Sequence, residues 1–270
     1  MHESGNAELA KLADSGGCTN PRLTNRIAVV TGASRGLGKF FAETLAREGA
    51  HVILAARSSN LQEIADGIQR SGGTSYCVEM DVARDDSVLH AFDRITTQWG
   101  CPSIVINNAG ITEMVDTLDQ KPSSFDRILA TNLRGPWAVA REAAKHMVAN
   151  KIPGAIVNIA SIVGLRQAGR VTAYAVTKSA VVQLTKQLAL EWARYGIRVN
   201  ALAPGYVETD LNREFFAGAK GQEMIRRIPM RRLTRMEDLI EPLMLLAGDG
   251  GAFITGAVLP VDGGHLICSL

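Results

Sequence analysis

The stretch Thr31-Gly32-Ala33-Ser34-Arg35-Gly36-Leu37-Gly38 decides how the rest of this 270-residue chain is interpreted. It follows a short β-branched run and precedes a segment with helical periodicity, Lys39–Glu48. Glycines at a strand-to-helix turn permit positive φ angles and let the backbone approach a pyrophosphate closely. The start of the helix adds free N–H groups and a favourable dipole. The stretch therefore predicts a dinucleotide-binding turn.

Short apolar runs alternate with longer amphipathic segments after Arg26. The runs are nearly continuously apolar, which is typical of parallel strands that are covered on both faces. The predicted strands are Ile27–Thr31, His51–Ala55, Ser75–Met80, Ser103–Ile106, Ala155–Ala160, Ile197–Leu202 and Ala257–Val261. Strands that alternate with helices predict an α/β fold with a doubly wound parallel sheet in three layers. The polar segment 1–24 is expected to be a flexible N-terminal tail, and residues 25–270 to form one domain.

Local signals also predict where individual helices begin and end. Capping-box patterns at Ser59 and Ser123 predict helix starts at these two places. Gly49 stands where a helix that ends near Glu48 requires a left-handed residue.

Composition excludes several classes of protein. The 29 basic and 27 acidic residues give a formal charge of only +2, so no nucleic-acid or membrane surface is indicated. No apolar run approaches the roughly 18 residues of a membrane helix, and the N-terminus lacks the pattern of a signal peptide. The four cysteines are scattered, without a CxxC pair or a histidine at metal spacing. We therefore expect a reduced, cytoplasmic protein with no metal site.

A tyrosine and a lysine are spaced to share one helix face. Tyr174 and Lys178 are four residues apart in a predicted helix. The pKa of a free tyrosine is about 10, and a lysine ammonium together with an oxidised nicotinamide would lower it. Tyr174 is then a candidate general acid toward a carbonyl oxygen, or base toward an alcohol. Such a pair in isolation is usually a surface neighbour pair, so this interpretation depends on the glycine turn.

Further motifs follow in a fixed order along the chain. They are Asn107-Asn108-Ala109-Gly110 after the fourth predicted strand, Asn132 in the next helix, Ser161 at the end of the fifth strand, Tyr174-Ala175-Val176-Thr177-Lys178, Pro204-Gly205 with Thr209, and Val261-Asp262-Gly263-Gly264. With the spacing Gly-x-x-x-Gly-x-Gly of the first turn, this order resembles the short-chain dehydrogenase/reductase family. The likeness covers about residues 25–265.

The resemblance implies a single Rossmann-type domain and an oxidoreductase that uses a nicotinamide cofactor. Asn132, Ser161, Tyr174 and Lys178 would be the catalytic residues. Ser161 would hydrogen-bond the reacting oxygen, and Asn132 would hold a water that links Lys178 to solvent. The residues implied to contact the cofactor are Gly32, Ser34, Arg35, Gly36, Leu37, Gly38, Arg57, Ser58, Asp81, Val82, Asn108, Ala109, Gly110, Tyr174, Lys178, Pro204, Gly205, Val207 and Thr209.

The end of the second strand predicts which dinucleotide is bound. An acidic residue there accepts the 2′-hydroxyl of NAD, whereas an arginine accommodates the 2′-phosphate of NADP. Here the strand end reads Ala56-Arg57-Ser58, and Arg35 lies in the glycine turn. Two guanidinium groups bind a phosphate well, so we expect NADP(H) to be preferred, with NAD(H) as the alternative.

Specificity is expected to reside in a short lid at about residues 206–230. It contains apolar residues such as Tyr206 and Phe216 that would line a pocket, and basic residues that either dock an anionic carrier or are simply solvated. Ile162, Val163, Leu165 and Gln167 after Ser161 are further candidates. His265 is expected to be a surface or subunit-contact residue.

Several functions remain open from the sequence. The leading hypothesis is an NADP(H)-dependent carbonyl reductase or alcohol dehydrogenase, with a 3-oxoacyl-thioester reductase, of the acyl-carrier-protein type, as the first specific candidate. A sugar, polyol or sugar-acid (gluconate-type) dehydrogenase is the alternative. A non-catalytic NADP-binding sensor or scaffold would be expected to lack one of the four catalytic residues, and all four are present.

Two predicted helices indicate self-association. Asp126–Asn150 and Thr172–Tyr195 carry apolar residues on more than one side, and such helices need a partner besides their own sheet. In the family that this sequence resembles, the equivalent helices form subunit interfaces. We therefore expect a homodimer or homotetramer, a small-molecule carbonyl or alcohol substrate, and no nucleic-acid or membrane partner.

Overall fold

A seven-stranded parallel sheet forms the centre of the molecule. The computed structural model describes residues 21–57, 60–208 and 213–268. The strands are β1 (Ile27–Thr31), β2 (His51–Ala56), β3 (Thr74–Glu79), β4 (Ile104–Asn107), β5 (Gly154–Ile159), β6 (Ile197–Pro204) and β7 (Val258–Val261). Their order is β3-β2-β1-β4-β5-β6-β7, and all neighbours pair in parallel. The order reverses at β1, which pairs with both β2 and β4.

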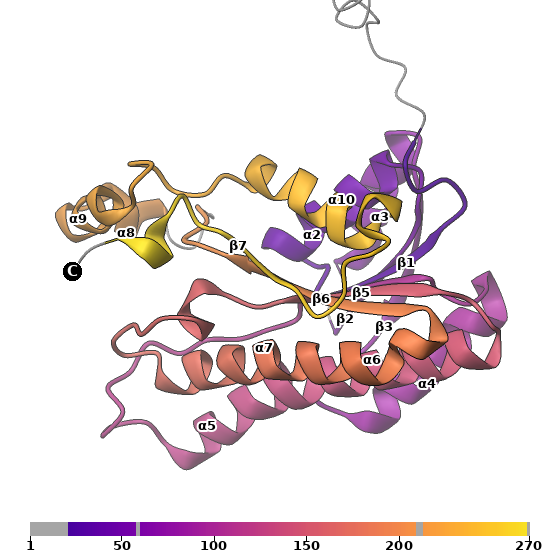
Figure 1. The fold of residues 1–270 in the computed structure, drawn as a ribbon, viewed down its shortest axis with the longest axis horizontal. Coiled ribbons are helices and arrows are strands. Elements are labelled where there is room, and N and C mark those ends of the chain that lie inside the picture. Colours follow the sequence, from indigo (N-terminus) through magenta and orange to yellow (C-terminus); the bar gives the residue numbers. More distant parts are fainter. Residues whose placement is uncertain (1–20, 58–59, 209–212, 269–270) are drawn as a thin grey trace, which may run out of the picture.

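Helices cover both faces of the sheet, as Figure 1 shows. One face packs on α2 (Gly36–Arg47), α3 (Leu61–Arg70) and α10 (Ile240–Ala247), and the other on α4 (Asp85–Trp99), α6 (Gly135–Ala149) and α7 (Thr172–Trp192). Strand side chains alternate between the two cores: Val30 belongs to the first and Val29 to the second. The predicted three-layer, doubly wound α/β fold is therefore confirmed.

The remaining elements lie around this framework. They are α5 (Pro122–Leu129), the π-helix η1 (Ala130–Arg134), the lid helices α8 (Arg213–Ala217) and α9 (Ala219–Arg227), and the short 3₁₀ turns η2 (Ile162–Gly164), η3 (Ala193–Tyr195), η4 (Met236–Leu239), η5 (Asp249–Gly251) and η6 (His265–Ile267). The lid helices follow β6 and lie beyond the carboxyl ends of the strands, at the left of Figure 1. The site must therefore be built from loops at that edge.

The strands begin and end within two residues of their predicted bounds. Gly49 adopts the expected left-handed conformation, with φ +87°. The N-cap of α3 is Asn60, and Ser59, the expected cap, lies outside the described residues.

Two further predictions are exceptions. The helix expected to start at Ser123 begins earlier: its N-cap is Lys121, and Pro122 occupies the first turn, where its missing N–H costs nothing. The second exception is the tail, because residues 21–24 pack on the domain.

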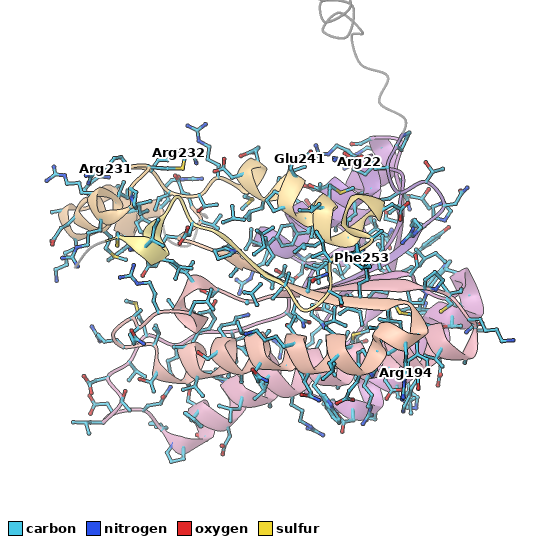
Figure 2. The ribbon with its side chains drawn as sticks, viewed as in Figure 1. Arg22, Arg194, Arg231, Arg232, Glu241 and Phe253 are labelled. Atoms are coloured by element: carbon cyan, nitrogen blue, oxygen red, sulfur yellow. The ribbon has the colours of Figure 1, made fainter. Side chains whose placement is uncertain are left out.

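Leu23 and Arg22 explain why these residues belong to the domain. Leu23 is buried, and its N–H donates to the carbonyl of Glu48 over 2.8 Å. The Arg22 guanidinium forms ion pairs with Glu48 at 2.7 Å and with Glu241 at 2.8 Å (Figure 2). The packed chain thus extends at least to residue 21, and the earlier part of the predicted tail lies outside the described residues.

Within the described ranges, no helix is long and apolar enough to cross a membrane. In the same ranges, no cluster of three or more His, Cys, Asp or Glu side chains is placed to hold a metal ion. Cys77, Cys101 and Cys268 are free thiols.

Candidate active site

The candidate residues gather at the carboxyl ends of β1, β4, β5 and β6. The glycine turn joins β1 to α2, Asn108 follows β4, and Ser161 follows β5. In open parallel sheets, ligands bind in the crevice at these strand ends, where the strand order reverses. Here the reversal lies between β1 and β4.

The three glycines of the turn have different structural roles. A Cβ on Gly38 would lie 2.2 Å from the carbonyl oxygen of Gly32, so Gly38 is required for packing inside the turn. A Cβ on Gly36 would meet nothing within 4 Å, although φ there is +53°. Gly36 is therefore open toward the outside of the turn. The N-cap of α2, Arg35, makes no side-chain capping bond, so the helix start keeps N–H groups for an anion. These features fit a dinucleotide pyrophosphate.

Thr31 holds the turn against β4, a role that the sequence analysis missed. Its Oγ1 accepts from the N–H groups of Asn108 at 3.0 Å and Ala109 at 3.1 Å. The Asn108 Nδ2 donates in return to the Thr31 carbonyl at 3.0 Å. A hydroxyl-bearing residue directly before the first glycine was the available signal. These bonds fix the distance between the glycine turn and the Asn108 segment.

The predicted adenosine-end residues follow three neighbouring strands: Arg35 comes after β1, Arg57 after β2 and Asp81 after β3. Arg35 and Arg57 are exposed, and within the described chain neither makes a side-chain hydrogen bond or ion pair. Arg57 lines a surface depression of about 520 Å³ with Asp81. The Asp81 carboxylate accepts from the N–H of Ala83 at 3.0 Å, which fixes this loop, and the following Val82 is buried. Ser58 lies outside the described residues.

The segment after β6 completes the predicted cofactor set. Gly205 donates its N–H to the carbonyl of Val261 at 2.9 Å, and a Cβ there would lie 2.9 Å from the Cα of Asp262. Val207 is buried and forms a bridge with Thr234. Pro204 is the last residue of β6, and Thr209 lies outside the described residues.

Tyr174, Ser161 and Lys178 lie close to one another. Ser161 hydrogen-bonds the Tyr174 hydroxyl, and the Ser161 Oγ itself accepts from the N–H of Val163 at 3.3 Å. Ser161 is thereby oriented to donate its proton. The Lys178 Nζ lies 5.5 Å from the centroid of the Tyr174 ring and donates to the carbonyl of Ile159 at 2.6 Å. The turn after β5 and helix α7 thus supply all three groups.

Burial dominates the acid–base properties of the pair. It lowers the pKa of Lys178 to about 8 because the ammonium loses its hydration. Burial also raises the pKa of Tyr174, and the hydrogen bond donated by Ser161 opposes that rise. A lowered pKa of Tyr174 was predicted for Lys178 acting together with an oxidised nicotinamide. The polypeptide alone does not provide it, because desolvation of the phenolate outweighs the Ser161 hydrogen bond.

Asn132 is buried within a π-helical turn between α5 and α6. Its Oδ1 accepts from the N–H of Ile111 at 2.8 Å, and its Nδ2 donates to the Ile111 carbonyl at 2.8 Å and to Thr177 Oγ1 at 3.3 Å. π-helical turns of this kind are frequent at functional sites. A Cβ on Gly110 would lie 3.5 Å from the Asn132 Oδ1 and 3.8 Å from the Lys178 Nζ. Asn132 therefore ties the loop after β4 to helix α7, next to Lys178.

The walls of the substrate end differ in part from the prediction. Ile162 and Val163 are buried beneath the turn, whereas Leu165 and Gln167 are exposed. His265, which was expected at the surface, is buried, because the Tyr206 ring packs over it with 5.4 Å between ring centroids. Its Nδ1 has no hydrogen-bond partner within the described residues.

The lid folds its aromatic residues inward and pairs several of its charges. Phe216 is buried and packs edge-on against Tyr206, with 5.9 Å between centroids. Arg227 pairs with Glu223 at 2.7 Å, and Arg232 donates to Asp238 at 2.9 Å. These pairs support the interpretation of the basic residues as a solvated lid surface.

Comparisons with known proteins agree with this geometry. A family model described as "Enoyl-(Acyl carrier protein) reductase" matches residues 32–265. The chain is 36% identical over 244 residues to cis-4-hydroxycyclohexanecarboxylate dehydrogenase of Sinomonas cyclohexanicum, covering 90% of this chain and 97% of that protein. It is 36% identical over 243 residues to a 3-oxoacyl-(acyl-carrier-protein) reductase of Pseudomonas aeruginosa, covering 90% and 98%. The crystal structure of a gluconate 5-dehydrogenase from Burkholderia cenocepacia with NADP and tartrate superposes with a TM-score of 0.88, 34% identity and coverage of 93% and 98%.

Proposed function

This chain belongs to the short-chain dehydrogenase/reductase family, an oxidoreductase family, and from that premise we propose its reaction. It transfers a hydride between NADP(H) and a carbonyl or secondary alcohol, with Tyr174 as general acid and base. The observation that carries the proposal is the convergence of Ser161, which follows β5, with Tyr174 and Lys178, which lie near the start of α7.

Each of the four catalytic candidates has a defined task in this reaction. Tyr174 gives a proton to the carbonyl oxygen during reduction and takes it back during oxidation. Ser161 hydrogen-bonds the same oxygen and stabilises the charge that develops on it. Lys178, protonated below a pKa of about 8, places positive charge beneath the Tyr174 ring. Asn132 holds the loop after β4 in register with Lys178.

The glycine turn, the start of α2 and the segment after β6 are the groups that would hold the dinucleotide. When bound, the nicotinamide supplies or accepts the hydride, while the protein fixes its position and surroundings. Arg35 and Arg57 favour NADP(H), because two guanidinium groups that pair with no carboxylate among the described residues follow the strands where the adenosine ribose is expected. Solved relatives that carry NADP support this choice. Comparing kcat/KM for NADPH and NADH tests it, and equal or better use of NADH would contradict it.

Two substrate classes remain candidates for the reaction. A 3-oxoacyl thioester is the first, supported by the bacterial acyl-carrier-protein reductases among the relatives. A sugar acid or related hydroxy acid is the second. It is supported by the gluconate dehydrogenase among the solved relatives and by the hydroxycyclohexanecarboxylate dehydrogenase. Turnover of β-keto thioesters, keto-sugar acids and aromatic ketones, followed at 340 nm, separates these classes.

A Tyr174→Phe substitution tests the catalytic assignment. The variant keeps the ring and loses only the hydroxyl, so we expect it still to bind NADPH. Turnover should fall at least about 100-fold, the usual contribution of a positioned acid–base group. Full activity in the variant would contradict the mechanism. Binding without turnover in the wild-type protein, across the whole panel, would favour the sensor alternative instead.

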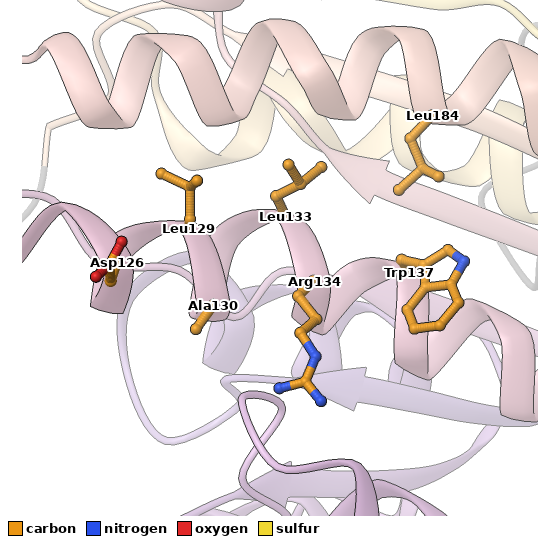
Figure 3. A pocket seen from close by; sticks show the side chains of 7 residues that line it. All are labelled: Asp126, Leu129, Ala130, Leu133, Arg134, Trp137 and Leu184. Carbon is orange, nitrogen blue, oxygen red and sulfur yellow. The ribbon is translucent and has the colours of Figure 1, made fainter.

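A second copy of this chain is the proposed partner. An open groove of about 540 Å³ lies between the α5–α6 segment and α7. Figure 3 shows Leu133 and Trp137 on one side of it and Leu184 on the other. Exposed apolar faces of this kind mark association surfaces, which supports the expected homodimer or homotetramer.

A further inference from the structure

Arg166 stands on the turn that carries Ser161, and this turn is fixed in place. The Arg166 N–H donates to the carbonyl of Ile162 at 2.9 Å. The Ser179 hydroxyl donates to the Gly164 carbonyl at 2.9 Å, and a Cβ on Gly164 would lie 2.7 Å from the backbone of Lys178. The turn is therefore locked against α7, the helix that also supplies Tyr174. Arg166 consequently has a defined position relative to the reacting hydroxyls.

The Arg166 guanidinium lies where the Ser161 turn, the start of the lid and the C-terminal segment meet. Its Nη1 donates to the carbonyl of His265 and to the Cys268 Sγ. Its positive charge acts to lower the pKa of both Tyr206 and His265, whose rings pack at a tilt of 47°, so the cation is close to this pair. Tyr206 directly follows the Pro204-Gly205 segment. The cation therefore lies between the Ser161 turn and the Tyr206 segment, the two segments that would border a substrate at Ser161.

No described carboxylate neutralises this charge. Asp262 is the acidic residue that acts on His265, but its two oxygens accept from the N–H groups of Gly264 at 2.9 Å and Leu266 at 2.7 Å. The Nε and Nη2 of Arg166 have no hydrogen-bond partner within the described residues. These two nitrogens form the side of a guanidinium that presents parallel N–H groups, which is the edge that binds a carboxylate in bidentate fashion.

We propose that Arg166 binds a carboxylate carried by the substrate, so that the enzyme selects hydroxy acids and keto acids. This inference rests on the proposed function, because it uses the same Ser161–Tyr174 site. It favours the second of the two substrate classes, in which the charge belongs to the reacting molecule. In a 3-oxoacyl thioester, by contrast, the negative charge is the phosphate of the carrier to which the acyl group is attached.

Calorimetric binding to the protein–NADP⁺ complex tests the proposal without requiring turnover. The probes are lactate, tartrate and gluconate, each compared with its neutral amide. We expect at least one acid to bind about 10- to 100-fold more tightly than its amide, the range that charge-assisted hydrogen bonds supply. Arg166→Met should abolish this difference while leaving the affinities for the amides and for NADP⁺ unchanged. Arg166→Lys should restore part of it.

A matched control removes a distant arginine. Arg194 is exposed at the far end of α7 (Figure 2), so Arg194→Met changes the net charge equally and should preserve the preference for acids. The proposal is overturned if no acid binds more tightly than its amide, or if Arg166→Met keeps the preference.

A second comparison identifies the source of the anion. If Arg166→Met raises KM for acetoacetyl-coenzyme A but not for the neutral acetoacetyl-N-acetylcysteamine, and leaves the acids unaffected, the anion is a carrier phosphate and the carboxylate assignment is wrong. If no carbonyl in the turnover panel is reduced while acids still bind through Arg166, the proposed reaction is wrong and the carboxylate site still stands.

Discussion

Lys178 is the residue whose charge state is most sensitive to its surroundings. Its Nζ is buried and bonded to the Ile159 carbonyl, and burial lowers its pKa to about 8. The ammonium form therefore predominates at neutral pH and is lost as the pH rises through that value. Because this charge lies beneath Tyr174, its loss removes the support for a tyrosinate.

A pH profile tests the role of Lys178. We expect kcat/KM for carbonyl reduction by the wild-type protein to fall above pH of about 8 as one proton is lost. In Lys178→Arg, whose guanidinium stays charged, any remaining activity should persist to higher pH. A flat wild-type profile from pH 7 to 10 would contradict the assignment.

The open side of Gly36 yields a second prediction for a single residue. Gly36 and Gly72 both have positive φ, +53° and +84°, and an added Cβ meets nothing within 4 Å at either position. Each substitution by alanine should therefore lower the free energy of unfolding by about 1 kcal/mol through backbone strain. Only Gly36→Ala should weaken NADPH binding, by more than about tenfold, because only there does the methyl group occupy the proposed phosphate surface. Equal NADPH affinities in the two variants, measured by fluorescence titration, would rule out that surface.

At the level of elements, a buried polar chain joins two strands to two helices. The Asn107 Nδ2 donates to the Asn158 Oδ1 at 2.9 Å and to the Pro136 carbonyl at 3.1 Å. The Asn158 Nδ2 donates to Thr185 Oγ1 at 2.9 Å, and Thr185 donates to the Val181 carbonyl at 2.8 Å. β4, β5, α6 and α7 are thereby held in one register.

Thr185→Val tests this chain of hydrogen bonds. Valine has the same shape but leaves the buried Asn158 Nδ2 without an acceptor, so unfolding in urea should show a loss of about 1–3 kcal/mol. Thr97→Val, the same change at an exposed site in α4, should stay within about 0.5 kcal/mol. Similar losses for the two variants would mean that the buried hydrogen bonds contribute little.

The elements also define what sequence patterns can and cannot predict. β1 appears at its predicted bounds, Ile27–Thr31. Its residues pack into the two cores, so its continuous run of apolar, β-branched residues predicts a buried strand without a competing helical pattern. The π-helix around Asn132 was not predicted, since one extra residue in a helical turn leaves the apolar pattern almost unchanged. The burial of His265 and the placement of Arg166 were also missed. Both depend on contacts between segments far apart in the chain, Tyr206 with His265 and Arg166 with His265, which no local pattern records.

For the whole molecule, the groove between α6 and α7 predicts self-association. Leu184→Glu places a charge in this apolar groove, and burying an unpaired charge at an interface is costly. Sedimentation at micromolar concentration should show an oligomer for the wild-type protein and a shift toward monomer for the variant. Leu89→Glu, on α4 and outside the groove, should sediment as the wild type. A monomeric wild-type protein would contradict the prediction.

The separation of the site residues along the chain has a consequence for folding. The glycine turn, Asn108, Asn132, Ser161 and Tyr174 come from different segments, and Thr31 joins the turn to β4 only once the strands have paired. No short fragment can therefore hold the dinucleotide. Ligand binds the native chain and leaves the unfolded one alone, so it must stabilise the entire sheet by mass action. In a cell, the concentration of the coenzyme would then help to set how long each copy of this protein survives.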